Sequence, residues 1–458
     1  QEVDPEEEAA VAVIRARVAE RVAALEAVMT DALPAAFALL ARLCEVESMV
    51  RVLQLVSVLV EVLGVRVAPH LPAIAAALPQ AWAFASQHMP AAGSSGASPA
   101  KAAASKKDGG SGDTGAVVRL HSALLAVATH LVGKLRRAAL SDPQVAATVY
   151  PLLHYATSLG SPESECLVEE AFRLWSCALS ALPEVPPPLL GLLPHLAAIL
   201  ARGRDNTAAL GILESYLLLG AAPSVIPLMD LIQGALVNTV KAAETATIQS
   251  LTPATGPGAP GQGGMPAGGM ASAAAAAAQR VLSPETAAEA MAASALADVM
   301  LQLSPHEVPS LLAPTFRAMA AFVAHPALPA QGLNIKVVNV LEGFLEVLGR
   351  VFMVSPAAFA ALIPAHDDQH QQQQQHHQGQ GGQQGGAAAG PQSRFIDKWL
   401  TVASARFLEE VIGVKTMAML GRYRRRIATA SLCALVAAGA TPPALLDTPA
   451  HTARACTL

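Results

Sequence analysis

The chain has 458 residues and a net charge of −5, and its composition holds only 14% charged and 4% aromatic residues. This length suits two or three globular domains or one long repeat array. No basic tract with interleaved aromatics is present, so the sequence gives no support for nucleic-acid binding. Much of the apolar content is alanine, which favours helices and packs poorly in sheets. The composition predicts an all-α protein.

The first segment, residues 1–89, has the apolar spacing of amphipathic helices. Pro34 is expected to open the second helix, Ser48 to cap the third and Gly64 to end it, because these residue types favour those positions. The four predicted helices cover residues 6–30, 33–47, 49–63 and 65–86.

Three segments interrupt the helical pattern. They are rich in Ala, Gly, Ser and Lys, then in Gly, Ala and Pro, and then in His, Gln and Gly, and they cover residues 90–116, 251–280 and 365–393. None has enough large apolar residues to offset the entropy cost of ordering. We therefore expect disordered loop inserts, which leave blocks of helix pairs at residues 1–89, 117–250 and 281–364 and C-terminal helices at 394–458.

Residues 163–220 form the clearest unit in the chain. An apolar helix ends before Pro183, a second helix is expected over residues 189–201, and Gly203 suits its C-terminal cap. Asp205 or Asn206 can start the next helix as an N-cap. Further predicted helices cover residues 119–137, 145–158, 224–241, 284–303, 307–323, 333–354, 394–408 and 422–438.

The second helix of several pairs carries a proline near its start, where the missing N–H has no partner to lose. The prolines are Pro69 and Pro72, Pro151, Pro194, Pro227 and Pro314. Pro151 and Pro194 are 43 residues apart, and Pro194 and Pro227 are 33 apart. Such intervals, with short loops between apolar helices, are typical of two-helix solenoid repeats. The prediction is an α-solenoid of HEAT-type antiparallel helix pairs, an ARM-like superhelix.

The sequence holds no phosphate-binding glycine loop, zinc-protease motif or nucleophile elbow. A helical enzyme is therefore disfavoured, and no catalytic, cofactor-binding or metal residue is assigned. Four histidines in the third insert could bind a soft metal, but the His/Gln bias favours a disordered segment. They are His366, His370, His376 and His377.

Five cysteines at irregular spacing include no CxxC pair, and four of them lie in helical patterns. We expect reduced core thiols and an intracellular compartment. They are Cys44, Cys166, Cys177, Cys433 and Cys456. His154 and His195 are expected at solvent edges or in ordinary hydrogen bonds.

Three tryptophans, Trp82, Trp175 and Trp399, are either peptide anchors or core residues. For Trp175 the core interpretation is favoured, because Leu174 and Leu179 share its helix face. A basic group after residue 421 is a solvated face or a site for an acidic partner; it comprises Arg422, Arg424, Arg425 and Arg426.

Residues 427–446 carry no charge, but Gly439 and the Pro442–Pro443 pair break the stretch. A buried helix is favoured over a membrane span, so no membrane insertion is expected. The chain begins with Gln and shows no signal peptide, and a fragment of a longer protein is expected.

Particular residues carry a family resemblance. The run from Tyr150 through Pro151 to Leu153, followed by Leu167 to Trp175 and then Leu179, resembles HEAT repeats of importin-β-type karyopherins, most closely the importin-11 branch. The Leu78–Trp82 run resembles the same family. The similarity covers about residues 29–219 and is only architectural from residue 284 onward.

The resemblance implies a nuclear transport receptor that binds protein cargo, Ran-GTP and nucleoporins and shuttles between cytoplasm and nucleus through the nuclear pore. The family's Ran-binding N-terminal repeats have no counterpart in this sequence, so Ran would bind through repeats absent from this chain. The alternative is a HEAT scaffold of the phosphatase or vesicle-coat type, because fold alone does not fix function.

Overall fold

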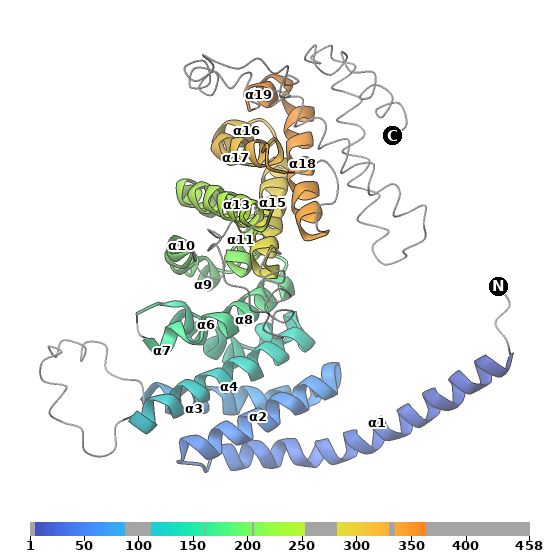
Figure 1. Cartoon of the computed structure of the whole chain (residues 1–458). Helices are drawn as coiled ribbons and strands as arrows, with labels where there is room; N and C mark the ends of the chain where they lie inside the picture. Colours follow the sequence, from blue (N-terminus) through green and yellow to red (C-terminus); the bar gives the residue numbers. More distant parts are fainter. Residues whose placement is uncertain are drawn as a thin grey trace, which may run out of the picture. The chain divides into compact units, whose positions relative to one another are not determined.

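The computed structural model describes residues 5–87, 111–160, 162–203, 206–251, 282–328 and 335–362. Every regular element in these ranges is a helix (Figure 1), which confirms the predicted all-α class. The chain forms two compact units, the first made of Gln1–Ile199 with Leu219–Ser224, and the second of Leu200–Leu218 with Val225–Leu458.

In the first unit, the helices form two rows. Row A contains α2 (Val46–Leu63), α4 (Ser111–Leu135) and α8 (Val168–Ala181), each packed on the next. Row B contains α3 (Leu71–Gln87) and α6 (Pro143–Thr157), which pack on each other and against row A (Figure 1). The other elements are α1 (Pro5–Leu40), η1 (Gly64–His70), α5 (Arg137–Ser141), α7 (Pro162–Glu165), α9 (Pro187–Leu190) and α10 (Leu193–Arg202).

The second unit repeats this plan. One row contains α11 (Asn206–Leu218), α15 (Pro284–Leu303) and α18 (Ile335–Val354), and the other contains α13 (Met229–Leu251) and α17 (Ala313–Val323). Its shorter elements are η3 (Ile226–Leu228), α16 (Val308–Leu311) and α19 (Pro356–Ala360), whereas α12 (Ala222–Val225) lies mostly in the first unit. In both units a helix contacts its successor in the same row, which is the packing of stacked helix pairs.

Small residues let α15 and α18 approach closely. Half of the buried residues of α15 are alanines, and Gly343 of α18 lies opposite Ser294. A Cβ atom added to Gly343 would lie 2.7 Å from the Ser294 hydroxyl oxygen. Larger aromatic side chains fill the space on the other side of α18, where Phe344 makes an edge-to-face contact with Phe322 at 5.6 Å between ring centroids.

Two helix starts were predicted wrongly in the first unit. Pro34 lies inside the continuous helix α1. Leu33 and Phe37, on either side of the proline, are both buried, and their packing keeps the helix continuous despite the proline. Ser48 does not cap α2: the helix begins at Val46, and the Ser48 hydroxyl donates to the side chain of Glu45.

The glycine and proline stops are confirmed. Gly64 and Gly203 adopt positive φ values of 60° and 67°, which the absence of a Cβ atom allows. Helix α8 ends at Ala181, ahead of Pro183. The single helix predicted over residues 189–201 is instead two, α9 and α10, which are separated at Gly191.

The proline signature holds at three of its positions, while Pro69 and Pro227 lie in the 3-10 helices η1 and η3 that precede α3 and α13. Pro72, Pro194 and Pro314 are the second residues of α3, α10 and α17, but Pro151 lies in the interior of α6. Pro143 opens that helix instead, directly after the Asp142 cap, whose carboxylate accepts hydrogen bonds from two backbone N–H groups at 2.9 and 3.2 Å.

Several predictions fall outside the described residues. These include the third insert and the helices expected over residues 394–408 and 422–438. Helix α4 begins at Ser111, inside the predicted 90–116 insert, and the remainder of that insert lies outside the described ranges. The block boundaries therefore stay predictions.

Candidate protein-interaction surfaces

The described residues contain no group of three or more His, Cys, Asp or Glu side chains that could hold a metal ion. The four histidines of the third insert and the arginines after residue 421 lie outside these ranges. The features that bear on function are polar clusters between helices and exposed apolar faces.

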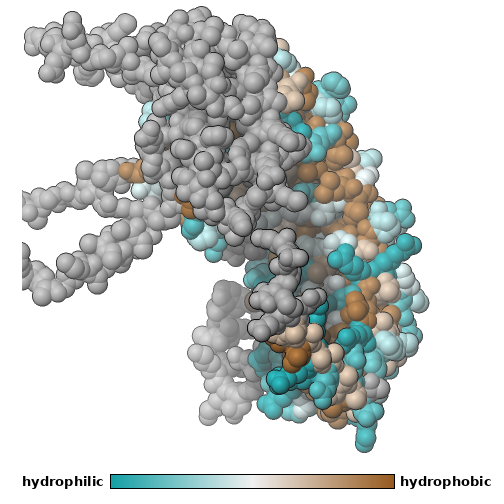
Figure 2. Space-filling view, turned by 90° about the vertical axis from the view of Figure 1, so that its right-hand side faces the viewer, coloured by the Kyte–Doolittle hydropathy of each residue, from teal (hydrophilic) through white to brown (hydrophobic). Residues whose placement is uncertain are grey.

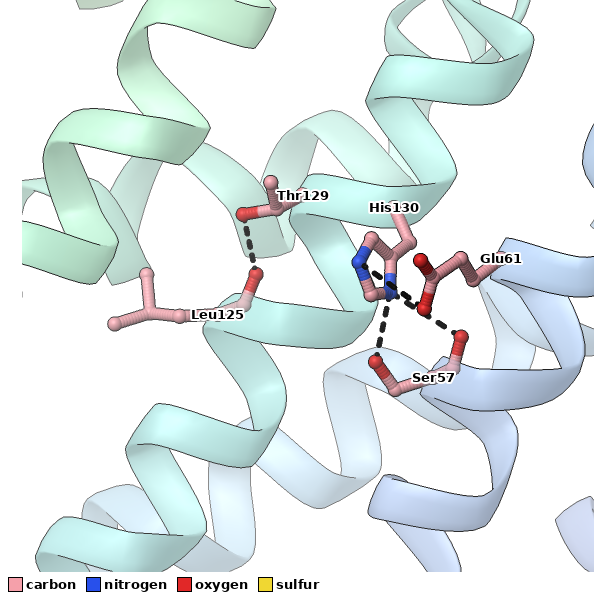
Figure 3. Close-up of polar contacts among 5 residues, drawn as sticks. All are labelled: Ser57, Glu61, Leu125, Thr129 and His130. Atoms are coloured by element: carbon pink, nitrogen blue, oxygen red, sulfur yellow. Dashed lines mark hydrogen bonds and ion pairs between the residues drawn. The ribbon is translucent and has the colours of Figure 1, made fainter.

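Ser57, His130 and Glu61 join α2 to α4 in an arrangement that superficially resembles a catalytic triad (Figure 3). The His130 Nδ1 atom lies 2.9 Å from the Ser57 hydroxyl and 3.2 Å from the Ser57 carbonyl oxygen. The carbonyl can only accept, so in the tautomer that bonds to it Nδ1 donates its proton there and cannot act as a base toward Ser57. The Glu61 carboxylate lies 3.9 Å from Nε2. The cluster therefore serves as a polar link within row A.

His154 and His195 make the ordinary contacts that the sequence predicted. His154 is exposed, and its ring meets that of the half-buried His195 edge to face at 4.4 Å. The Thr157 hydroxyl donates to the Leu153 carbonyl at 2.8 Å and accepts from His195 Nδ1 at 3.0 Å. Burial lowers the pKa of His195, and the adjacent His154 lowers it further.

A third histidine, His121 of α4, is fully buried, and neither ring nitrogen has a hydrogen-bond partner within the described chain. Its ring lies against Trp82 of α3 and Tyr155 of α6, at centroid distances of 5.6 and 4.8 Å. Desolvation lowers the pKa of His121 from 6.5 to about 4, and a contact with the Val117 backbone, which does not meet the geometry of a hydrogen bond, offsets this only in part. No sequence motif singles out this residue, and only its apolar flanks in LHSALLAV indicate a buried position.

The tryptophans and cysteines divide between core and surface. Trp175 is fully buried, as predicted, and Trp82 is half-buried, while Trp399 lies outside the described residues. Cys44 and Cys166 are exposed, so their assignment to the core is wrong. Each lies in a turn between helices and not on an apolar helix face.

The remaining cysteines give a mixed result. Cys177 is half-buried, and burial raises the pKa of its thiol. Cys433 and Cys456 lie outside the described ranges. The described thiols are free, in keeping with the reduced state that the sequence predicted.

In the second unit, a charged cluster crosses three helices of one row. Arg350 of α18 binds both carboxylate oxygens of Asp298 of α15, the second at 3.2 Å, and both side chains are less than one-fifth exposed. The Gln302 amide donates to the same carboxylate at 2.6 Å. Burial raises the pKa of Glu214 of α11, and nearby Asp298 raises it further. The cluster links neighbouring helices of this row. It places two carboxylates, Asp298 and Glu214, beside one guanidinium, that of Arg350.

Row A of the first unit exposes an apolar stripe on α2. Three side chains at helical spacing on α2 are each more than half exposed, Leu55, Val58 and Val62, and Val65 at the start of η1 is exposed beside them in the sequence. Figure 2 shows such apolar residues interspersed with hydrophilic ones on the face that it displays. Contiguous exposed apolar side chains mark candidate interaction sites.

Three helical stretches are long and apolar enough to cross a membrane, judged only by length and composition: Ala9–Leu40, Val46–Gln87 and Gly115–Leu135. The second is divided by the turn at Gly64. The third belongs to α4, which packs on both α2 and α8. These neighbouring helices bury more than half of the stretch. The sequence candidate at 427–446 lies outside the described residues.

A family model described as importin-11-like, TPR repeats, matches residues 122–402, while a search of curated proteins found no match. The matched range takes in the Tyr150–Leu153 and Leu167–Trp175 runs, and it extends well past residue 219. It does not include the stretch from 29 to 121, where the sequence also suggested a resemblance. TPR and HEAT repeats are both solenoid units of paired helices.

Proposed function

Because the chain belongs to the importin-11-like family of importin-β-type karyopherins, we propose that it binds protein cargo for transport through the nuclear pore. The family is non-catalytic, so the chain acts by binding. The match over residues 122–402 carries this proposal, because it covers most of the described helix pairs in both units.

Nucleoporins are the second proposed class of partner. The exposed side chains of Leu55, Val58 and Val62 on α2, with Val65 at the start of η1, support this proposal, because covering apolar surface with a partner is favourable in water. Passage through the pore implies a receptor that moves between cytoplasm and nucleus.

Ran-GTP is the third proposed partner. In the family, Ran binds the N-terminal repeats, and no segment of this sequence resembles those repeats. We therefore assign Ran binding to the complete gene product and not to the described helices.

Pull-down experiments test the proposal directly. The complete gene product, immobilised, should retain an importin-11-type cargo, and Ran-GTP but not Ran-GDP should bind it. If it binds neither cargo nor Ran-GTP, the chain is not a transport receptor. In that case a scaffold role would explain the same helix pairs.

The stripe on α2 has a separate test. The double substitution Leu55→Glu/Val62→Glu places two charges on an exposed face without disturbing the core. Binding to immobilised nucleoporin repeats should fall at least tenfold, whereas the Gln54→Glu control, also exposed on α2, should bind normally. Equal binding by both variants would remove the stripe from the proposal.

A further inference from the structure

Helix α1 is covered at one end only. It packs on α2 and α3, and its C-terminal residues Leu33, Ala36 and Leu40 are buried. Nearer its N-terminus, Ile14 and Val18 are 61% and 54% exposed. Figure 1 shows that part of α1 extending away from α2 and α3. Covering these apolar side chains would be favourable in water.

The exposed and the buried side chains of α1 belong to one helix face. Val11, Ile14, Val18 and Val22 follow each other at intervals of 3 and 4 residues, which places them on one side of an α-helix. Leu33 comes 11 residues after Val22, about three full turns further on. The uncovered part of this face therefore continues an established interface between helices. We call Val11, Ile14 and Val18 the α1 seam.

Helix α2 of the same chain does not reach the α1 seam. Glu26 of α1 forms an ion pair with Arg66 at 2.7 Å, and Arg66 already lies past the end of α2 at Leu63. The seam lies 8 to 15 residues further toward the N-terminus of α1, which is about 12–22 Å along a helix. The cover of the α1 seam must come from another surface.

A matching uncovered surface lies on α2. Leu55, Val58 and Val62 repeat the same two intervals, 3 and then 4 residues, and each is more than half exposed. We call these three residues the α2 stripe. The α1 seam and the α2 stripe both extend over about 10 Å, or two helical turns. Their common 3 and 4 spacing is the one with which the side chains of two helices interlock.

The charges beside the two surfaces are complementary. Arg15 and Arg21 are exposed and flank the α1 seam on opposite sides, and residues 11–18 include no acidic residue. Glu61 flanks the α2 stripe with its side chain 57% exposed, while Arg51 lies one turn before the stripe. Because an arginine stands on each side of the seam, one of them faces Glu61 whichever way the two helices run.

We propose that two copies of this chain form a dimer in which the α1 seam of each copy packs on the α2 stripe of the other. The same two surfaces are then used twice about a two-fold axis, so association stops at the dimer. The inference does not rest on the transport function. It adds a consequence for that function, because the second copy covers the α2 residues proposed to bind nucleoporins and competes with them.

Sedimentation equilibrium of the full chain tests the proposal over about 1–100 µM. The mean mass should rise from 46.9 kDa toward twice that value. The double substitution Ile14→Glu/Val18→Glu, and separately Val58→Glu, should each weaken the dimer about tenfold or more. The control is Val13→Glu, which is 54% exposed on a different face of α1 and should leave association unchanged. A monomer at every concentration would overturn the proposal.

The two apolar variants also identify which surfaces meet. If α1 pairs with α1, Val58→Glu associates normally, and if α2 pairs with α2, Ile14→Glu/Val18→Glu does, and either result overturns the proposed contact. An equimolar mixture of these two variants restores one of the two contacts. It should therefore associate more strongly than either variant alone, and a mixture no stronger than its components would also contradict the proposal.

A charge exchange tests the contact without touching its apolar residues. Glu61→Arg should weaken the dimer about threefold to tenfold, and adding Arg15→Glu/Arg21→Glu should restore it. Circular dichroism at 222 nm checks that each variant keeps its helix content, and the charge exchange decides where an apolar variant does not. Flotation with phosphatidylcholine vesicles checks the other occupant of an apolar helix: vesicle binding by a monomeric chain, lost in Ile14→Glu/Val18→Glu, would assign the seam to a membrane.

Discussion

Single buried residues determine how closely helices of the two rows pack. His121 is enclosed by Trp82 and Tyr155, and no described group satisfies its ring nitrogens. A neutral imidazole always carries one N–H, so burial without a partner costs free energy. A charged imidazole at the same position would cost more.

The first prediction concerns acid stability. The pKa of His121 is about 4 in the folded chain, against 6.5 for an ordinary solvated histidine, so the unfolded chain binds the proton more readily. Stability is therefore present above pH 6.5 and is lost as pH falls toward 4, by about 2 kcal/mol between pH 7 and 4.5. Urea unfolding at these two pH values measures this.

The matched variant is His121→Phe, which keeps an aromatic ring in the same site. Its unfolding free energy should equal or exceed that of the parent chain at pH 7, because an unsatisfied polar group is removed. Its loss of stability between pH 7 and 4.5 should be smaller than that of the parent. An unchanged pH dependence would mean that other groups cause the acid sensitivity.

The second prediction concerns Gly343. Gly343→Ala places a methyl group 2.7 Å from the Ser294 hydroxyl and 3.3 Å from its Cβ atom. Either the Ser294 hydroxyl rotates away and loses its hydrogen bond to the Met291 carbonyl, or α15 and α18 move apart, so the unfolding free energy should fall by about 1–3 kcal/mol. Thermal unfolding followed by circular dichroism measures the change.

Gly234 supplies the control for that substitution. It lies exposed on α13 with no atom within 4 Å of an added Cβ, so Gly234→Ala should stabilise the chain by about 0.5–1 kcal/mol through helix propensity. If both alanine variants stabilise the chain, the close approach of α15 and α18 is not what Gly343 provides.

At the scale of elements, the rows are held by apolar faces and by a few polar links. The link between α15 and α18 is the pair Asp298–Arg350, with less than one-fifth of each side chain exposed. Removing one member of a buried pair leaves the other charge without its partner. The exposed pair Arg173–Glu169 lies within α8 and holds no helices together.

The third prediction follows from this contrast. Asp298→Asn should lower the unfolding free energy by about 2 kcal/mol, whereas Arg173→Gln should change it by less than about 0.5 kcal/mol. Asp298→Asn should also lower the pKa of Glu214, since Asp298 contributes to raising it. Urea unfolding and carboxyl NMR titration measure the two effects, and equal costs for both variants would contradict the assignment.

At the scale of the whole molecule, stacking in rows explains why the chain can accommodate long inserts between its helices. A helix contacts its successor in the same row and the paired row, so a segment between two helices need not take part in packing. The Gly/Ala/Pro composition of residues 251–280 predicts such an insert.

The fourth prediction tests that insert. Replacing residues 255–278 by a twelve-residue Gly/Ser linker should change the unfolding free energy by at most about 1 kcal/mol, since loop entropy varies slowly with length. Scanning calorimetry measures it. A loss of several kcal/mol would mean that the segment packs on the helices, and the insert assignment would be withdrawn.

The sequence by itself determined the helical class, several helix ends and the family. Alanine content, proline and glycine act locally on backbone conformation, so their effects can be read without partners. Pro183 and Gly64 show this, and the run from Leu167 to Trp175 lies within the matched family range.

Only the tertiary structure decided which residues meet. The enclosure of His121, the 2.7 Å approach at Gly343 and the pairing of Asp298 with Arg350 each join helices that are separate in sequence. Pro34 was misjudged for the same reason, because burial on both sides of the proline outweighs its local preference. Apolar spacing shows that a face is buried, but packing partners are set by the summed contacts of whole helices.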